Sequence, residues 1–141
     1  MGLHAVATVG LRTIQQIATL HDFRFHQDQN GLAITQELLT SSLPGAPVVD
    51  PNGHCVGFIS QFDVLAVLEA GRDVSQLTAK EIMVPDPIAI SISTTLAEAV
   101  KIMKDHHFLV LPVEENGVVR GCLTRQDLLG AWVGLGLEPK D

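Results

Sequence analysis

Two segments of the chain have the apolar spacing of an amphipathic helix. In the segment 93–107, apolar residues recur at positions i, i+3, i+4 and i+7, which places them on one helical face. These residues are Leu96, Ala99, Val100 and Met103. The segment 28–42 predicts a weaker helix, because polar residues and a glycine interrupt its pattern. The leucines that keep its spacing are Leu32, Leu38 and Leu39.

Each predicted helix is followed by a predicted β-hairpin. The segments 46–57 and 111–121 both read as strand, turn and strand. The turns contain Pro51-Asn52-Gly53 in the first case and Asn116-Gly117 in the second. Asn-Gly adopts positive φ readily, which a tight hairpin turn requires.

The chain repeats itself after these hairpins. GFISQFDVL (57–65) and GCLTRQDLL (121–129) share a glycine, a hydroxyl residue and an aspartate at matching positions. Asp63 and Asp127 lie 64 positions apart. A short β-prone piece precedes each helix, at 22–25 and at 87–91. The predicted unit is therefore β-α-β-β-α, present twice in an α/β (α+β) chain.

The duplication predicts two subdomains that pack about a pseudo-twofold axis, because each copy is too small to bury its own sheet well. A helical piece, TAKEIM (78–83), lies between the copies, and 12–18 is its expected counterpart before the first copy. The expected divisions are an N-terminal segment 1–11, repeat 1 at 12–70, a linker at 71–80, repeat 2 at 81–135 and a tail at 136–141.

Composition and charge narrow the function classes. The 141 residues are 46% hydrophobic and carry a formal net charge of −7, with no basic run. That charge argues against binding to duplex nucleic acid, which needs a cationic surface. Residues 1–20 lack the pattern of a signal peptide, and no apolar run reaches membrane-spanning length. We therefore expect a cytoplasmic protein without membrane insertion, in which Cys55 and Cys122 are buried, reduced thiols.

At this point the chain resembles a pair of CBS domains, the cystathionine-beta-synthase-type repeat, also called a Bateman module. The resemblance covers roughly 12–135 and runs through TAKEIMVPDPIAIS and the segments that follow it up to TRQDLL. It implies a stand-alone CBS domain pair with two small three-stranded sheets. It also implies adenosine ligands, with AMP, ADP or ATP expected here, a homodimer, and regulation of an unknown partner protein without any required cofactor.

The second repeat supplies the first candidate nucleotide site. Thr124 and the first-turn amides of its helix favour a phosphate, and Arg125 adds a cation. Asp127 has two oxygens that suit the two hydroxyls of a ribose, and the resemblance implies these same roles. The apolar walls for the base are expected from Ile88, Ala89, Phe108, Leu109, Val110 and Pro112. A capping box needs no ligand, so Thr124 and Asp127 are equally consistent with a simple helix cap.

The first repeat supplies a matching candidate site. Ser60 and Asp63 correspond to Thr124 and Asp127, and Gln61 replaces the cation. Arg24 is placed to compensate for that missing charge. The small residues before the strand predict a roomier space there. They include Gly45, Ala46 and Pro47.

Three further features receive a structural interpretation. Adjacent histidines on a helix point about a hundred degrees apart, so His106 and His107 do not predict a metal site. The apolar segment 128–137, which contains Trp132, is expected to be part core and part partner contact. No catalytic set of nucleophile, base and orienting group appears, so we expect no enzyme.

Two functional hypotheses follow. The first is a regulatory adenine-nucleotide sensor that transmits its ligand state to a partner protein. The alternative is a ligand-free dimerisation or interaction module, in which the capping bonds are satisfied within the chain. The sequence does not say whether one or two nucleotides bind, or whether a dimer is parallel or antiparallel.

Overall fold

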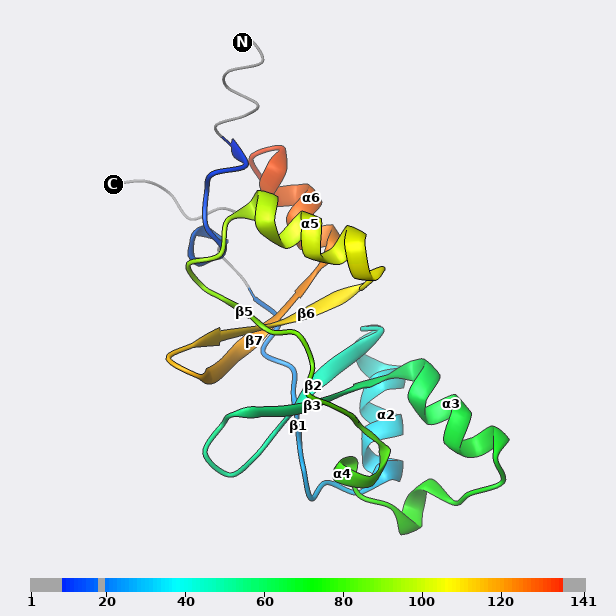
Figure 1. Ribbon diagram of the computed structural model, residues 1–141. Coiled ribbons are helices and arrows are strands. Elements are labelled where there is room, and N and C mark those ends of the chain that lie inside the picture. The colour runs from blue at the N-terminus through cyan, green and yellow to red at the C-terminus, as the bar shows by residue number, and fades with distance from the viewer. Residues whose placement is uncertain (1–8, 18–19, 136–141) are drawn as a thin grey trace. The chain divides into compact units, whose positions relative to one another are not determined.

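The computed structural model describes residues 9–17 and 20–135, which form two compact units (Figure 1). The repeat-1 unit comprises residues 23–88 and 116–119. The repeat-2 unit comprises the other described residues: 9–17, 20–22, 89–115 and 120–135. The two units therefore alternate along the chain, and the segment before residue 23 belongs with the second repeat.

The sheet of the repeat-1 unit has four strands in the order β1-β2-β3-β4. β1 is parallel to β2, and the other neighbours are antiparallel. The strands are β1 (Phe25–His26), β2 (Gly45–Val49), β3 (Cys55–Ser60) and β4 (Val84–Pro85). The predicted three-stranded sheet is wrong for this unit, because β4 adds a fourth strand beside Gly57 and Phe58. β4 has only two residues, which are too few to show the alternation of apolar and polar positions that predicts a strand.

Helices cover this sheet and close its apolar core. They are α2 (Gly31–Ser41), the 3-10 helix η2 (Val74–Gln76), α4 (Ala79–Ile82) and α3 (Gln61–Glu69). In α2 the buried stripe consists of Gly31, Ile34 and Leu38. The predicted face was wrong for two leucines, since Leu32 is 44% and Leu39 75% exposed. Gly31 is buried but has no apolar side chain, so the sequence pattern did not identify it as part of the buried face of α2.

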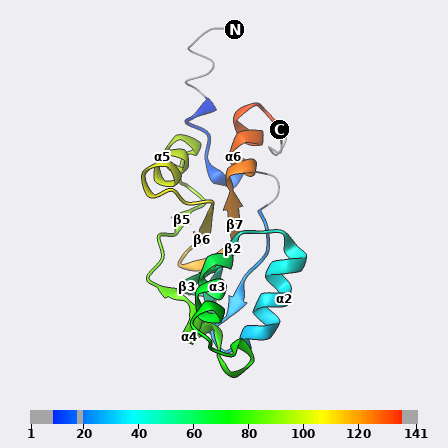
Figure 2. The same ribbon diagram turned by 90° about the vertical axis from the view of Figure 1, so that its right-hand side faces the viewer.

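The repeat-2 unit has the predicted three-stranded sheet, in the order β5-β6-β7. Its strands are β5 (Ile90–Ser91), β6 (Val110–Glu115) and β7 (Val118–Thr124). Its helices are the 3-10 helix η1 (Ile14–Gln16), α5 (Leu96–His106) and α6 (Arg125–Trp132). In the two ribbon views, α5 and α6 lie side by side against the sheet (Figures 1 and 2).

The core of the repeat-2 unit confirms three of the four residues of the helical face predicted for 93–107, whereas Val100 is 38% exposed. Leu96, Ala99 and Met103 are buried in it, together with residues of β6, β7 and α6. Ile14 and Ile17, from the segment before the first repeat, are buried in the same core. The backbone holds that segment in place, because the amide of Leu96 donates to the carbonyl oxygen of Arg12 at 2.8 Å.

The hairpin turns adopt the conformations that their residues predicted. Gly53 has a φ of 84°, and Asn116 and Gly117 have φ values of 53° and 79°. These positive angles need residues without a large side-chain penalty in the left-handed region. Within the part of the chain that the structure describes, no helix is long and apolar enough to cross a membrane.

Candidate functional site

The two repeats place matching polar side chains at the starts of α3 and α6. Ser60 and Thr124 are the N-cap residues, and each accepts a hydrogen bond from the amide of an aspartate three residues later. The distances are 3.1 Å for Asp63 and 3.2 Å for Asp127. Each aspartate returns a hydrogen bond by accepting from the amide of its cap residue at 2.8 Å. Both predicted pairs are therefore complete capping boxes.

The carboxylate of Asp63 is half engaged by this cap. Its Oδ2 accepts from both the amide and the hydroxyl of Ser60, at 2.8 and 2.9 Å. Among the described residues, no hydrogen bond or ion pair engages Oδ1 of Asp63. One carboxylate oxygen of the first repeat thus remains available to another donor.

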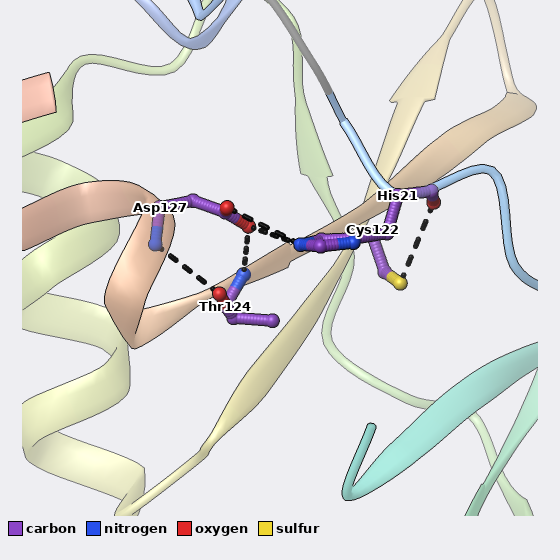
Figure 3. Close-up of polar contacts among 4 residues, drawn as sticks. All are labelled: His21, Cys122, Thr124 and Asp127. Atoms are coloured by element: carbon purple, nitrogen blue, oxygen red, sulfur yellow. Dashed lines mark hydrogen bonds and ion pairs between the residues drawn. The ribbon is translucent and has the colours of Figure 1, made fainter. Parts of the chain in front are cut away.

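The carboxylate of Asp127 is engaged on both oxygens. Oδ2 accepts from the amide of Thr124, and the ring of His21 lies against the remaining edge (Figure 3). His21 Nε2 is 3.2 Å from Oδ1 and 3.1 Å from Oδ2. The His21 side chain is 42% exposed and that of Asp127 17% exposed, so the contact sits at the surface. The two repeats therefore differ at their shared aspartate.

Backbone pairing with β7 holds His21 in this place. The His21 amide donates to the carbonyl oxygen of Cys122 at 3.1 Å, and the Cys122 amide donates to that of His21 at 2.9 Å. Gly121 permits this approach, because a Cβ there would lie 2.8 Å from the His21 carbonyl oxygen. No local pattern in the sequence identifies His21 as a site residue, because it lies 106 positions before Asp127 in the chain. The signal available was a lone histidine directly before the first β-prone piece.

Three residues predicted for the second site line a separate feature of the repeat-2 unit. They are Phe108, Leu109 and Arg125, and they border a groove of about 720 Å³ along α5 and α6. The other described residues that line it are Val100, Met103, Lys104, His107, Leu128, Leu129 and Trp132. Thr124 and Asp127 are not among them. The groove is largely apolar with a basic rim, and its volume is that of a site for a small molecule.

The charged residues on and near the groove include an ion pair on α5. Lys101 donates to Asp105 at 2.7 Å, and this hydrogen bond lowers the pKa of the Asp105 carboxyl. Asp105 is not among the described residues that line the groove. Its basic lining residues are Lys104, His107 and Arg125.

The other residues predicted for the base pocket of the second repeat lie in or next to strands, in both units. Val110 and Pro112 are buried in β6. Ala89 lies half-buried before β5, and Ile88 belongs to the repeat-1 unit. The structure thus brings Thr124 and Asp127 together with His21.

Residues predicted for the first site contact the protein's own backbone. Gln61 Nε2 donates to the Leu43 carbonyl oxygen at 3.2 Å, and Arg24 Nη1 donates to that of Val119 at 2.7 Å. Gly45, Ala46 and Pro47 are buried in β2. A Cβ at Gly45 would lie 2.6 Å from the ring of Phe58. Because Gly45 has no side chain, the Phe58 ring can lie directly against its backbone.

The structure also describes the histidine pair of α5, the two cysteines and Trp132. His106 stacks on Phe108 with ring centroids 5.1 Å apart, and His107 ends α5 with a φ of 58°. Cys122 is buried as predicted, whereas Cys55 is half-buried; both are free thiols. Trp132 packs partly against the core of the repeat-2 unit. Residues 136 and 137 of the apolar segment 128–137 lie outside the described residues.

Comparison with known families accounts for the repeated geometry. The family model described as "CBS domain" matches residues 32–70 and 79–134, which is most of the chain. The chain belongs to the CBS domain family. Its two matched CBS segments each contain one of the capping aspartates, and each is built from the helices and strands described above.

Relatives and solved structures share this architecture. The chloroplastic CBS domain-containing protein CBSX2 of Arabidopsis thaliana is 27% identical over 132 residues, covering 74% of this chain and 56% of CBSX2. A crystal structure of CBSX2 in complex with AMP matches with a TM-score of 0.74, 26% identity and coverage of 86% of this chain and 96% of that one.

A second solved structure is the CBS domain of a membrane protein from Sphaerobacter thermophilus. It matches with a TM-score of 0.72 and 27% identity, covering 89% of this chain and 91% of that one. The chain spans 25%, 53% and 56% of the lengths of three curated relatives. It thus matches only a part of each of those longer proteins.

Proposed function

We propose that this CBS domain pair is a regulatory module that binds adenine nucleotides, namely AMP, ADP or ATP, and passes its ligand state to a partner protein. The observation that carries the proposal is the duplicated pair of hydroxyl and aspartate at the starts of α3 and α6. The AMP complex of CBSX2, which is 26% identical to this chain, supports the choice of ligand.

The chemistry of each helix start suits a nucleotide. The positive end of the helix dipole at each helix start favours a phosphate. A carboxylate has about four acceptor positions, two on each oxygen, so one open oxygen can accept hydrogen bonds from ribose hydroxyls. Asp63 offers Oδ1 for this purpose without any rearrangement, and Arg125 adds a cation beside the second helix start. The proposed role is regulation. A ligand that binds one conformation of the module more tightly than another shifts the equilibrium toward that conformation.

The alternative function, a ligand-free interaction module, is also supported by an observation. Each helix cap is satisfied within the chain, by Ser60 with Asp63 and by Thr124 with Asp127. A cap of this kind contributes to stability without any ligand. A measurement of ligand-dependent stability separates the two functions.

AMP is expected to raise the melting temperature of the wild-type protein. At about 100 times its Kd, a ligand that binds only the folded state adds about 2.7 kcal/mol to the free energy of unfolding. Asp63→Ala and Asp127→Ala should each reduce this gain, and the double variant should lose it. Differential scanning fluorimetry with AMP, ADP and ATP measures the shifts.

Asp73→Ala is the matched control for these variants. Asp73 caps η2 by accepting from the Ser75 amide, and its hydrogen bonds with Ser75 lower the pKa of its carboxyl. The Asp73→Ala substitution therefore removes a capping aspartate outside the proposed sites. The increase in melting temperature caused by AMP should be the same as in the wild type. An unchanged melting temperature of the wild type with all three nucleotides at millimolar concentration would favour the ligand-free module.

The module also acts as a homodimer in this proposal. Exposed apolar side chains lie on the helices of both units. Groups of such side chains are commonly covered by a partner protein, which supports a dimer. On α2 and α3 they are Leu32, Leu39, Phe62, Leu65 and Leu68; on α5 and α6 they are Val100 and Leu129. A second copy of the chain that packs on either group would remove that group from water.

Leu129→Glu is expected to shift the protein from dimer to monomer. Leu129 is 68% exposed in the single chain and borders the groove. If a second copy covers this position, a glutamate there would bury a carboxylate at a cost of several kcal/mol. Leu11→Glu is the control, because Leu11 is 72% exposed and lies outside these helices. Light scattering coupled to size-exclusion chromatography measures the masses, and a dimer unaffected by Leu129→Glu would contradict this placement of the interface.

A further inference from the structure

The second repeat differs from the first in a contact that bears directly on ribose binding. Asp63 keeps Oδ1 open, whereas the imidazole of His21 lies within 3.2 Å of both oxygens of Asp127 (Figure 3). A carboxylate has about four acceptor positions. The Thr124 amide takes one of them, and His21 Nε2 lies across the edge between the two oxygens. A ribose diol would need that same edge.

The origin of the difference lies in the residue that pairs with the strand directly before each capped helix, β3 before α3 and β7 before α6. In the repeat-2 unit His21 pairs with Cys122 on β7. The corresponding position on β3 is Phe58, and its partner on β4 is Val84. A valine side chain cannot donate a hydrogen bond, so Val84 cannot give Asp63 the contact that His21 gives Asp127. The two sites thus share their cap geometry and differ in one side chain.

Two backbone hydrogen bonds fix the Cα of His21, while its side chain is 42% exposed. The imidazole is therefore free to rotate away without disturbing the strand pairing. The groups that face it are the Asp127 carboxylate from α6 and, at its backbone, the Cys122 thiol from β7, whose sulfur is 3.6 Å from the His21 carbonyl oxygen. Asp22 follows it in the chain.

We propose that His21 is a specificity-determining residue that occupies the ribose position on Asp127 and must leave before an adenosine ligand binds the second repeat. The inference rests on the proposed nucleotide function and concerns the unequal use of its two sites. The first repeat, whose Asp63 is uncovered, binds first; the second is reserved for ligands that displace the imidazole.

The test isolates the second site in an Asp63→Ala background and measures AMP binding by isothermal titration calorimetry. His21→Ala in that background is expected to tighten AMP binding about two- to fivefold, which is the scale of one exposed ion pair. The gain should be smaller for 2′-deoxy-AMP, because that ligand has a single hydroxyl for Asp127. His54→Ala, a change at an exposed histidine of the repeat-1 unit, should leave the AMP affinity unchanged.

The outcomes separate the two ideas. If AMP binds and Asp127→Asn weakens binding at the second site, but His21→Ala leaves the affinity unchanged or lowers it, the inference about His21 is overturned and the nucleotide function stands. If none of the proteins binds AMP, both are overturned. Because His21→Ala keeps both backbone hydrogen bonds with Cys122, we expect that variant to fold, and circular dichroism verifies this.

Discussion

Leu111→Ala is expected to lower the free energy of unfolding by about 2–5 kcal/mol. Leu111 lies in β6, is fully buried, and belongs to the core that α5, α6 and the segment around Ile14 close from one side. Removing three of its carbons leaves a cavity that this closely packed core cannot fill. Urea unfolding monitored by circular dichroism measures the loss as a shift of the transition midpoint.

A matched leucine tests whether the effect comes from burial. Leu65 is 57% exposed on α3, so Leu65→Ala should change the free energy of unfolding by no more than about 0.5 kcal/mol. Equal losses from the two variants would show that Leu111 is not in a packed core. Since a whole domain of this kind is stable by about 5–15 kcal/mol, the expected loss at Leu111 is a large share of the total.

Gly31→Ala should lower the free energy of unfolding by about 1–3 kcal/mol, because a methyl group has no room there. Gly31 is the first residue of α2 and is buried. A Cβ would collide with the carbonyl oxygen of Val74 and would lie 2.9 Å from Cδ1 of Ile82. The first of these atoms is backbone, so α2 or the η2 segment would have to move. The thermal midpoint and the urea midpoint should both fall.

Gly130→Ala is the control that gives the opposite sign. Gly130 lies within α6, and the nearest atom to an added Cβ is 3.8 Å away, which is ordinary contact. Alanine is favoured over glycine inside a helix by about 1 kcal/mol, so this variant should be stabilised. If both substitutions stabilised the protein, the close approach of α2 to η2 would be refuted.

The duplication made most of the fold predictable. The hairpin turns, the capping boxes and the apolar face of α5 were all visible as local patterns in the sequence. The face of α2 was not, because Gly31 occupies a buried position and Leu39 an exposed one. Strand β4 was also missed, since its pairing with β3 depends on backbone contacts at Gly57 and Phe58 rather than on any run of β-prone residues.

The candidate site was predictable in its local part only. A hydroxyl residue and an aspartate three positions apart identify a helix start from the sequence alone. The neighbour of that aspartate depends on which distant segment pairs with the preceding strand. His21 reaches Asp127 because residues 20–22 lie beside β7, and no pattern within either repeat encodes that pairing.

The alternation of the two units also sets an order of events during synthesis. The repeat-1 unit has most of its residues once the chain has reached residue 88, so it can begin to fold while the second repeat is still being made. Ile14 and Ile17, by contrast, pack against helices α5 and α6, which end about a hundred residues later. At about 5–20 residues per second, these isoleucines stay uncovered for roughly 5–20 s on the ribosome. A segment made early is thus among the last to be buried.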